Sequence, residues 1–280
     1  MRFLRPLVLA FLLFGPLPIW AQEISVEQAK RPEPIRDPQA LTIIAQSLAV
    51  AGGEQAFSGL HDYTASGRIV SYRSKDDQVY GTVTLRGRET RQFRMDANLP
   101  LGVRSYSISE GRSITKDEDG TILRPPDESA VLPSSDGFPQ REPLFPGSLA
   151  LPHQQLLAAL KLRRFSITYK GTVELDGRSV HCLRIEQLAP TAEVDATDMM
   201  PRYRTLDMYL DISTLQVLAT EAWVPRNVLR RIWYSDYRPV NGILAPFSIR
   251  EEMGGQLVWK IDLDQISFNS GLQDANFDLY

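Results

Sequence analysis

Hydrophobic and polar residues alternate with a period of two along most of this chain, which predicts antiparallel β-strands. The signal is clearest near the C-terminus, where strands are predicted over residues 229–238, 243–252 and 256–268. Asn241-Gly242 and Gly254-Gly255 separate these strands, and both pairs supply the positive φ angles that tight hairpin turns require. The pattern therefore indicates a β-rich protein.

The same alternation predicts strands in two further groups. The first covers residues 62–73, 78–87, 89–97, 103–109, 113–116 and 121–123, and the second covers residues 165–174, 178–188, 203–212 and 215–224. In total about 11 to 13 strands are expected. A boundary near Pro146 would create two halves that each need closure of both sheet edges, so one continuous sheet is the preferred interpretation.

Two helices are also predicted, one before the first group of strands and one between the two groups. Asp37 is suited to cap the first and Pro38 to begin it, and Leu41, Ile44 and Leu48 recur on one face before Gly52-Gly53 ends it. The second helix is predicted within residues 148–163, with Pro152 as its start and with Leu156, Leu157 and Leu160 on its apolar side.

One face of the predicted sheet is apolar across several strands. In the last strand Leu257, Trp259, Ile261 and Leu263 share a face, because side chains alternate along a strand. Neighbouring strands extend this face with Leu206, Met208, Leu210, Ile212, Ile243, Phe247 and Ile249. The helices must cover it, so the predicted fold class is mainly β with a helical lid (α+β).

This face offers two interpretations. If the helices cover it fully, it is an ordinary packed core. If they cover it incompletely, the remainder is a pocket for lipid or acyl chains, since each buried methylene contributes about 0.8 kcal/mol. The candidate ligand-binding residues are Leu206, Met208, Leu210, Phe247, Ile249, Trp259 and Ile261. Arg68 and Arg231 are candidates for the rim of the pocket.

Two long loops are predicted, one before the second helix and one after the strand that ends at residue 188. Residues 124–146 contain six prolines and are interpreted either as a tolerated insertion or as a flap over a binding mouth. Residues 189–202 carry Met199 and Met200, which are either adaptable apolar contacts or a buried plug. Together with Leu156 and Leu160, these two methionines are the lid candidates.

The first 21 residues have the pattern of a secretory signal peptide. Arg2 and Arg5 form the positive head, an apolar stretch follows, and the small residue Ala21 precedes Gln22. Retention as a membrane anchor is the alternative, although the apolar stretch is short for a bilayer and is broken by prolines. Residues 22–37 are predicted to be a flexible leader, and residues 38–280 to be one domain in the periplasm.

The net charge limits the classes of partner, and the cysteine content limits the possible disulfides. The full chain has a formal net charge of −3, and loss of the basic signal peptide makes the mature protein more acidic, which argues against nucleic acid as a partner. Cys182 is the only cysteine, so no intramolecular disulfide forms. Its apolar neighbours indicate a buried filler, with a reactive thiol as the alternative.

Catalytic and metal-binding signatures are lacking in the sequence. His61, His153 and His181 do not have the spacing of a zinc site, and there is no phosphate-binding loop, nucleophile elbow or dinucleotide fingerprint. The acidic pairs Asp76-Asp77 and Glu251-Glu252 are interpreted as solubilising residues. We therefore expect no cofactor, no metal and no enzymatic activity.

Several of these features resemble a known family. They are the export signal, the early helix ending in Gly52-Gly53, the β meander, the block YSDYRPVNGILAPF at residues 234–247 and the ending ISFNSGLQDANF at residues 266–277. Together they resemble exported bacterial proteins related to the lipoprotein-localisation factors, the LolA/LolB-like superfamily. The resemblance implies an unclosed β half-barrel, lidded by helices, whose concave face binds lipid tails of lipoproteins in the periplasm. The functional arginine of the carriers has no assignable position in this sequence.

Three functional hypotheses follow. The first is a non-enzymatic periplasmic protein that holds a lipid or a lipoprotein acyl chain. The second is a protein-interaction or sensor module of the envelope with a packed core and no lipid cargo. The third is an exported hydrolase with a site assembled from distant residues, such as His153 or His181 with a carboxylate.

Overall fold

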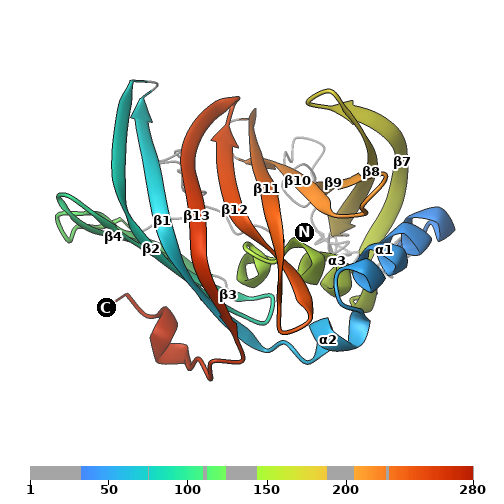
Figure 1. Cartoon of the computed structure of the whole chain (residues 1–280), viewed down its shortest axis with the longest axis horizontal. Helices are drawn as coiled ribbons and strands as arrows, with labels where there is room; N and C mark the ends of the chain where they lie inside the picture. The colour runs from blue at the N-terminus through green and yellow to red at the C-terminus, as the bar shows by residue number, and fades with distance from the viewer. Residues whose placement is uncertain are drawn as a thin grey trace, which may run out of the picture. The chain divides into compact units, whose positions relative to one another are not determined.

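The computed structural model describes residues 33–74, 76–109, 112–123, 144–187, 205–224 and 227–279. These residues form one open antiparallel sheet of 13 strands, with helices gathered against one side of its curve (Figure 1). The strand order is β6-β5-β4-β3-β2-β1-β13-β12-β11-β10-β9-β8-β7. The predicted single sheet and α+β class are confirmed.

The first and last strands lie side by side at the centre of this order, and the two edges are formed by β6 and β7. The first half comprises β1 (Asp62–Ser74), β2 (Asp77–Arg88), β3 (Gln92–Leu99), β4 (Gly102–Ser109), β5 (Arg112–Lys116) and β6 (Ile122–Leu123). The second half comprises β7 (Phe165–Leu175), β8 (Arg178–Gln187), β9 (Thr205–Asp211), β10 (Val217–Val224), β11 (Val228–Val240), β12 (Ile243–Met253) and β13 (Gln256–Phe268).

The helix predictions are confirmed in their main features. Helix α1 (Pro38–Val50) begins where predicted, because the Asp37 carboxylate accepts hydrogen bonds from the amides of Gln39 and Ala40. Helix α3 (Pro152–Lys161) begins at Pro152 as expected, whereas Ser148 belongs to a separate 3₁₀ turn, η1 (Pro146–Ser148). The short helix α2 (Glu54–Ser58) was not predicted.

Strands β3 and β10 begin later than predicted, for local reasons. Strand β3 begins at Gln92 rather than at Glu89, because Glu89 has a φ of 50° and turns the chain. Strand β10 begins at Val217 rather than at Leu215, because Leu215 has a φ of 57° in the turn that follows Asp211. In both cases a non-glycine residue takes a conformation that composition does not reveal.

The chain before α1 is attached to the edge of the sheet. The Ile167 amide donates to the carbonyl of Ile35 at 2.7 Å, and the Asp37 amide donates to the carbonyl of Ile167 at 3.0 Å. The Arg36 guanidinium donates to the carbonyls of Ala159 and Leu160 at the end of α3. Residues 35–37 therefore join β7 to α3, while residues 1–32, with the predicted signal peptide, lie outside the described residues.

The C-terminal segment folds back on the sheet through the start of β1. The Asp62 carboxylate, which is buried, accepts hydrogen bonds from the amides of Ser270, Gly271 and Leu272. Beyond it, the 3₁₀ turn η3 (Asp274–Phe277) buries Phe277. No helix among the described residues is long and apolar enough to cross a membrane.

Candidate functional site

The side of the sheet that faces the helices, called here the concave face, carries the main apolar cluster. Inward residues from both halves of the chain contribute to it, for example Leu85 and Phe93 from the first half and Ile232 from the second. A smaller cluster around Leu175, Val180 and Ala219 is separate from it. The concave face is thus one continuous apolar surface that spans the sheet.

The structure brings the predicted ligand-binding residues together. Leu206, Met208 and Leu210 on β9 share the concave cluster with residues of the central strands, namely Phe247, Ile249, Trp259 and Ile261. Each of the seven is at most 8% exposed. Of the lid candidates, Leu156 is fully buried in the same cluster and Leu160 packs against it, while Met199 and Met200 lie outside the described residues.

Residues 145–159, called here the covering segment, fill the concave face. Every one of these residues is buried, although α3 within it carries the polar run His153, Gln154 and Gln155. An amphipathic helix at a protein surface keeps its polar side in water. Residues 152–159 of this helix are buried on every side, so their polar groups are enclosed with the apolar ones.

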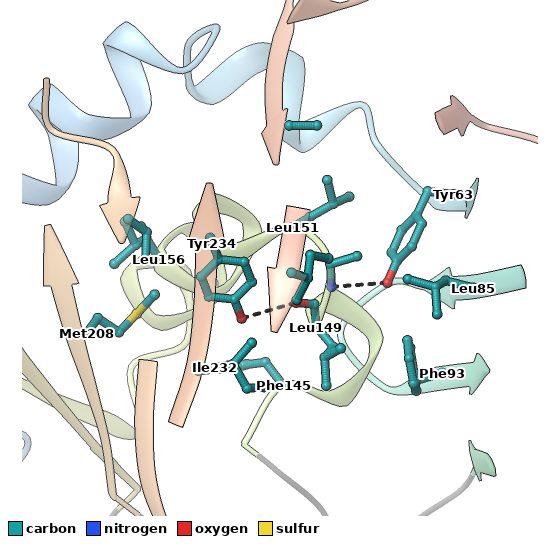
Figure 2. Close-up of a cluster of buried hydrophobic side chains, with 14 of the residues drawn as sticks. Tyr63, Leu85, Phe93, Phe145, Leu149, Leu151, Leu156, Met208, Ile232 and Tyr234 are labelled. Carbon is teal, nitrogen blue, oxygen red and sulfur yellow. Dashed lines mark hydrogen bonds between the residues drawn. The ribbon is translucent and has the colours of Figure 1, made fainter. Parts of the chain in front are cut away.

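Two tyrosines from the sheet hold the covering segment by its backbone (Figure 2). The Tyr234 hydroxyl on β11 donates to the carbonyl of Leu149 at 3.1 Å, and the Tyr63 hydroxyl on β1 accepts from the amide of Ala150 at 3.4 Å. Burial raises the pKa of Tyr234 to about 12, so this hydroxyl keeps its proton at neutral pH. The two contacts hold Leu149 and Ala150, directly after η1, between β11 and β1.

Gly147 brings the covering segment against the turn between β2 and β3. Its amide donates to the carbonyl of Thr90 at 3.3 Å. A Cβ at this position would lie 2.6 Å from the carbonyl oxygen of Glu89 and 2.8 Å from that of Arg88, which is closer than real Cβ atoms come. Only glycine allows this approach.

His153 is enclosed by aromatic rings at the start of α3. The Phe57 ring lies 6.0 Å from it, centroid to centroid, and the Tyr237 ring lies 5.6 Å away in an edge-on arrangement. Burial lowers the pKa of His153 to about 4, against the opposing effect of the Leu215 backbone. The imidazole is neutral at physiological pH, and its Nε2 atom has no hydrogen-bond partner in the described part of the chain.

The concave face also contains a buried ion pair. Arg230 on β11 donates through Nη2 to Oε2 of Glu251 on β12 at 2.7 Å, and the two side chains are 7% and 1% exposed. Burial lowers the pKa of Arg230, but the Glu251 carboxylate outweighs it and raises this pKa overall. Burial raises the pKa of Glu251, with Arg230 opposing the shift. The sequence interpretation of Glu251 as a solubilising residue is therefore wrong.

The strand pattern contained a signal for this pair. In β12 every second residue from Ile243 to Glu251 is buried, and Pro246 is buried besides, so the glutamate continues the inward alternation. Directly opposite Glu251 lie Ile232 on β11 and Trp259 on β13. A charge at an inward position is the feature that the sequence analysis missed.

Comparison with solved structures identifies the architecture. A DUF1329 family protein from Desulfovibrio piger superposes with a TM-score of 0.52 at 12% identity, covering 87% of this chain and 98% of its own. A LolA superfamily protein from Nitrosomonas europaea superposes with a TM-score of 0.50 at 10% identity, covering 84% of this chain and 97% of its own. An outer membrane lipoprotein-sorting protein domain from Vibrio parahaemolyticus gives 0.50 at 11% identity, with 84% and 97% covered.

This chain shares the fold of these three proteins, one of which is a LolA superfamily protein. The likeness is structural alone: no family model matches the sequence, and no curated protein matches it. The expected resemblance is thus confirmed at the level of the fold.

The outer face of the sheet carries several ion pairs. Arg231 points to this side, where it forms an ion pair with Glu221, and Arg68 is exposed beside Asp262. Neither arginine lines the rim of the concave face, so that prediction is wrong. The residue that does enter the concave face is Arg230, the immediate neighbour of Arg231.

A surface pocket of about 450 Å³ lies on the outer face of strands β8 to β11. It is lined by Arg184, Thr205, Asp207, Glu221, Trp223, Asn227 and Leu229. Arg184 and Asp207 form a bidentate ion pair with two bonds of 2.8 Å, and Glu221 pairs with Arg231, so the charged side chains of the wall are neutralised.

The remaining chemical candidates occupy structural positions. Cys182 is buried, and burial, followed by Asp207, raises its pKa to about 11, which agrees with an inert filler. His181 contacts the Tyr169 hydroxyl through Nδ1 at 3.0 Å. Among the described residues, no group of three or more His, Cys, Asp or Glu side chains is placed to hold a metal ion.

Proposed function

We propose that this protein is a non-enzymatic protein of the bacterial envelope that binds a lipid or a lipoprotein acyl chain on its concave face. The observation that supports it most is the mismatch between this face and its cover. A continuous apolar surface is occupied by a segment whose polar side chains, Ser148, His153, Gln154 and Gln155, each retain a buried atom without a partner in the described part of the chain.

Such a cover is costly to keep closed. Each buried polar atom without a partner costs about 1–3 kcal/mol relative to a satisfied one. An acyl chain carries no polar atoms along its length, and burial of about ten methylenes contributes roughly 8 kcal/mol before ordering costs. If an acyl chain displaced the covering segment, the polar groups of the segment would regain contact with water. The apolar face of the sheet would then be covered by the acyl chain instead.

The fold comparison supports the proposal independently. The superposed Vibrio structure is described as an outer membrane lipoprotein-sorting protein domain, and it superposes on 84% of this chain. The signal peptide predicted over residues 1–21 would place the protein in the periplasm. Residues 38–280 would then act as a single carrier-like domain.

A matched pair of photo-crosslinkers tests the proposal. Met208 and Tyr209 are neighbours on β9, and Met208 faces the concave cluster whereas Tyr209 lies on the outer side, where its hydroxyl bonds to Glu221. We replace each in turn with a photoreactive amino acid, irradiate cells and analyse the purified protein by mass spectrometry. Lipid adducts at position 208 but not at position 209 are expected. Equal labelling at both positions, or none at 208, would exclude acyl binding at this face.

The second candidate function is a protein-interaction or sensor module without lipid cargo. It is favoured by the close packing of the seven predicted ligand-binding residues, which are at most 8% exposed. Native mass spectrometry of protein extracted from membranes distinguishes the two functions. A carrier retains lipid masses, whereas a module with a permanent core has none and is crosslinked in cells to one protein partner.

A further inference from the structure

Three polar groups meet in the middle of the apolar concave face. Glu251 lies between Arg230, with which it is paired, and Trp259, which is directly opposite it on β13. Tyr234 and Tyr106 are both close enough to Arg230 to add to the rise in its pKa, although Tyr106 belongs to β4, several strands away from β11 in the sheet. The curvature of the sheet therefore encloses this polar spot from several strands.

Each of the three groups keeps an unused hydrogen-bonding atom. Nε of Arg230, Oε1 of Glu251 and Nε1 of Trp259 are buried and have no partner in the described part of the chain. Two of these atoms are N–H donors, and the third is a carboxylate acceptor. Buried polar atoms in folded proteins are nearly always satisfied, so three orphans at one spot require an explanation.

A contribution to the stability of the fold does not explain these three unpaired atoms. A buried ion pair is often no more stabilising than a well-packed apolar pair of the same volume, because both charges must be desolvated. The pair Arg230–Glu251 is also surrounded by residues of the main apolar cluster, including Ile232 and Ile249. Apolar side chains at both positions would continue the surface without leaving orphan atoms.

We propose that Arg230, Glu251 and Trp259 form a polar subsite that binds an amide group linking the acyl chain to the rest of the ligand. An amide presents a carbonyl acceptor and an N–H donor together, which are the complements of the Arg230 or Trp259 N–H and of the Glu251 carboxylate. The inference rests on the proposed acyl-binding function and names the ligand class for the same site.

The charge arrangement sets the selectivity. The carboxylate of a free fatty acid would meet the Glu251 carboxylate in a buried site, where like charges repel strongly. An ester supplies the carbonyl but no donor, so it would leave Glu251 unsatisfied. The expected order of affinity is amide, then ester, then free acid.

The test uses three ligands that share one hydrocarbon chain: N-methyloleamide, methyl oleate and oleate. Each is titrated against protein loaded with the neutral fluorophore 1-N-phenylnaphthylamine, and displacement is measured. We expect the amide to bind about tenfold or more tightly than the ester, because a hydrogen bond to a charged group is lost in the ester. Oleate should be the weakest of the three.

Variants assign the preference to the subsite. In Arg230→Met/Glu251→Leu the amide and the ester should bind equally well, and in Glu251→Gln the discrimination against oleate should shrink. Glu251→Gln keeps the shape of the side chain, so it still provides a test if the double variant does not fold. The matched control, Arg184→Gln/Asp207→Asn, removes an ion pair from the outer face and should leave the order unchanged.

The outcomes separate the two proposals. Equal binding of all three ligands to the unaltered protein, or an amide preference that survives in both subsite variants, overturns the polar subsite while acyl binding stands. Failure of every ligand to bind the unaltered protein overturns acyl binding and the subsite together.

Discussion

Substitution of Gly147 by alanine tests whether the covering segment gates the concave face. The new Cβ would lie 2.6, 2.8 and 2.9 Å from the carbonyl oxygens of Glu89 and Arg88 and the amide nitrogen of Arg91. All three are backbone atoms, so no side-chain rotation relieves the clash. Overpacking of this kind costs about 1–3 kcal/mol, and the cost falls on the closed state, in which Gly147 touches the turn.

The expected effect on binding follows from a two-state scheme. If the ligand binds only when the cover is displaced, its apparent dissociation constant is the intrinsic one divided by the fraction of open protein. A closed state raised by about 2 kcal/mol increases that fraction, and the apparent affinity, about 30-fold. The variant should therefore unfold more easily and yet bind an apolar ligand more tightly.

The assay is a titration of Gly147→Ala with 1-N-phenylnaphthylamine, together with hydrogen exchange over residues 145–159. The control is Gly171→Ala on the edge strand β7, where φ is +100° and the added Cβ meets nothing within 4 Å. It destabilises the protein by about 1–2 kcal/mol through backbone strain alone. The gating scheme is refuted if Gly147→Ala loses stability and binds no better than this control.

Three further substitutions probe the same architecture. The pKa of His153 is 6.5 in the unfolded chain but about 4 in the folded protein, so its contribution to stability is complete above pH 6.5 and is lost as the pH falls. The loss is about 3 kcal/mol by pH 4. The free energy of unfolding of His153→Phe, measured with denaturant, should therefore change less with pH than that of the unaltered protein. Tyr234→Phe removes the donor to the Leu149 carbonyl and should cost about 1–3 kcal/mol in thermal unfolding, because that carbonyl stays buried; an unchanged melting temperature would mean that the clamp contributes nothing. Asp62→Ala removes the acceptor of three successive amides and should lower the free energy of unfolding by about 2–4 kcal/mol. The C-terminal segment should then be the first site cut in limited proteolysis. Cleavage elsewhere first would contradict this role of Asp62.

The elements predicted from the sequence were those fixed by local chemistry. The three C-terminal strands, the start of α1 at Pro38 and the start of α3 at Pro152 all depend on a turn, a cap or a period contained in a few residues. The likeness to the lipoprotein-localisation factors rested on the export signal, the early helix, the β meander and the sequence blocks at residues 234–247 and 266–277. Local chemistry was sufficient because each such element is specified within its own segment.

The candidate site was predicted only in its apolar half. The alternation placed Met208, Phe247 and Trp259 on one face, where they do lie. It did not show that Glu251 remains on that face at the end of its strand, nor that a helix with the run His-Gln-Gln is enclosed on all sides. Burial of a polar residue depends on what covers it, and the cover comes from a distant part of the chain.

The pairing of β1 with β13 has a consequence for the order in which the molecule assembles. The centre of the sheet joins residues 62–74 to residues 256–268, so a long loop must close before this contact forms, and such contacts form slowly. A chain that lacks the last strand would present two half-sheets with bare inner edges, each a template for aggregation. Correct assembly of the sheet therefore waits until β13 has been synthesised, and a nascent or truncated molecule without β13 exposes both inner edges.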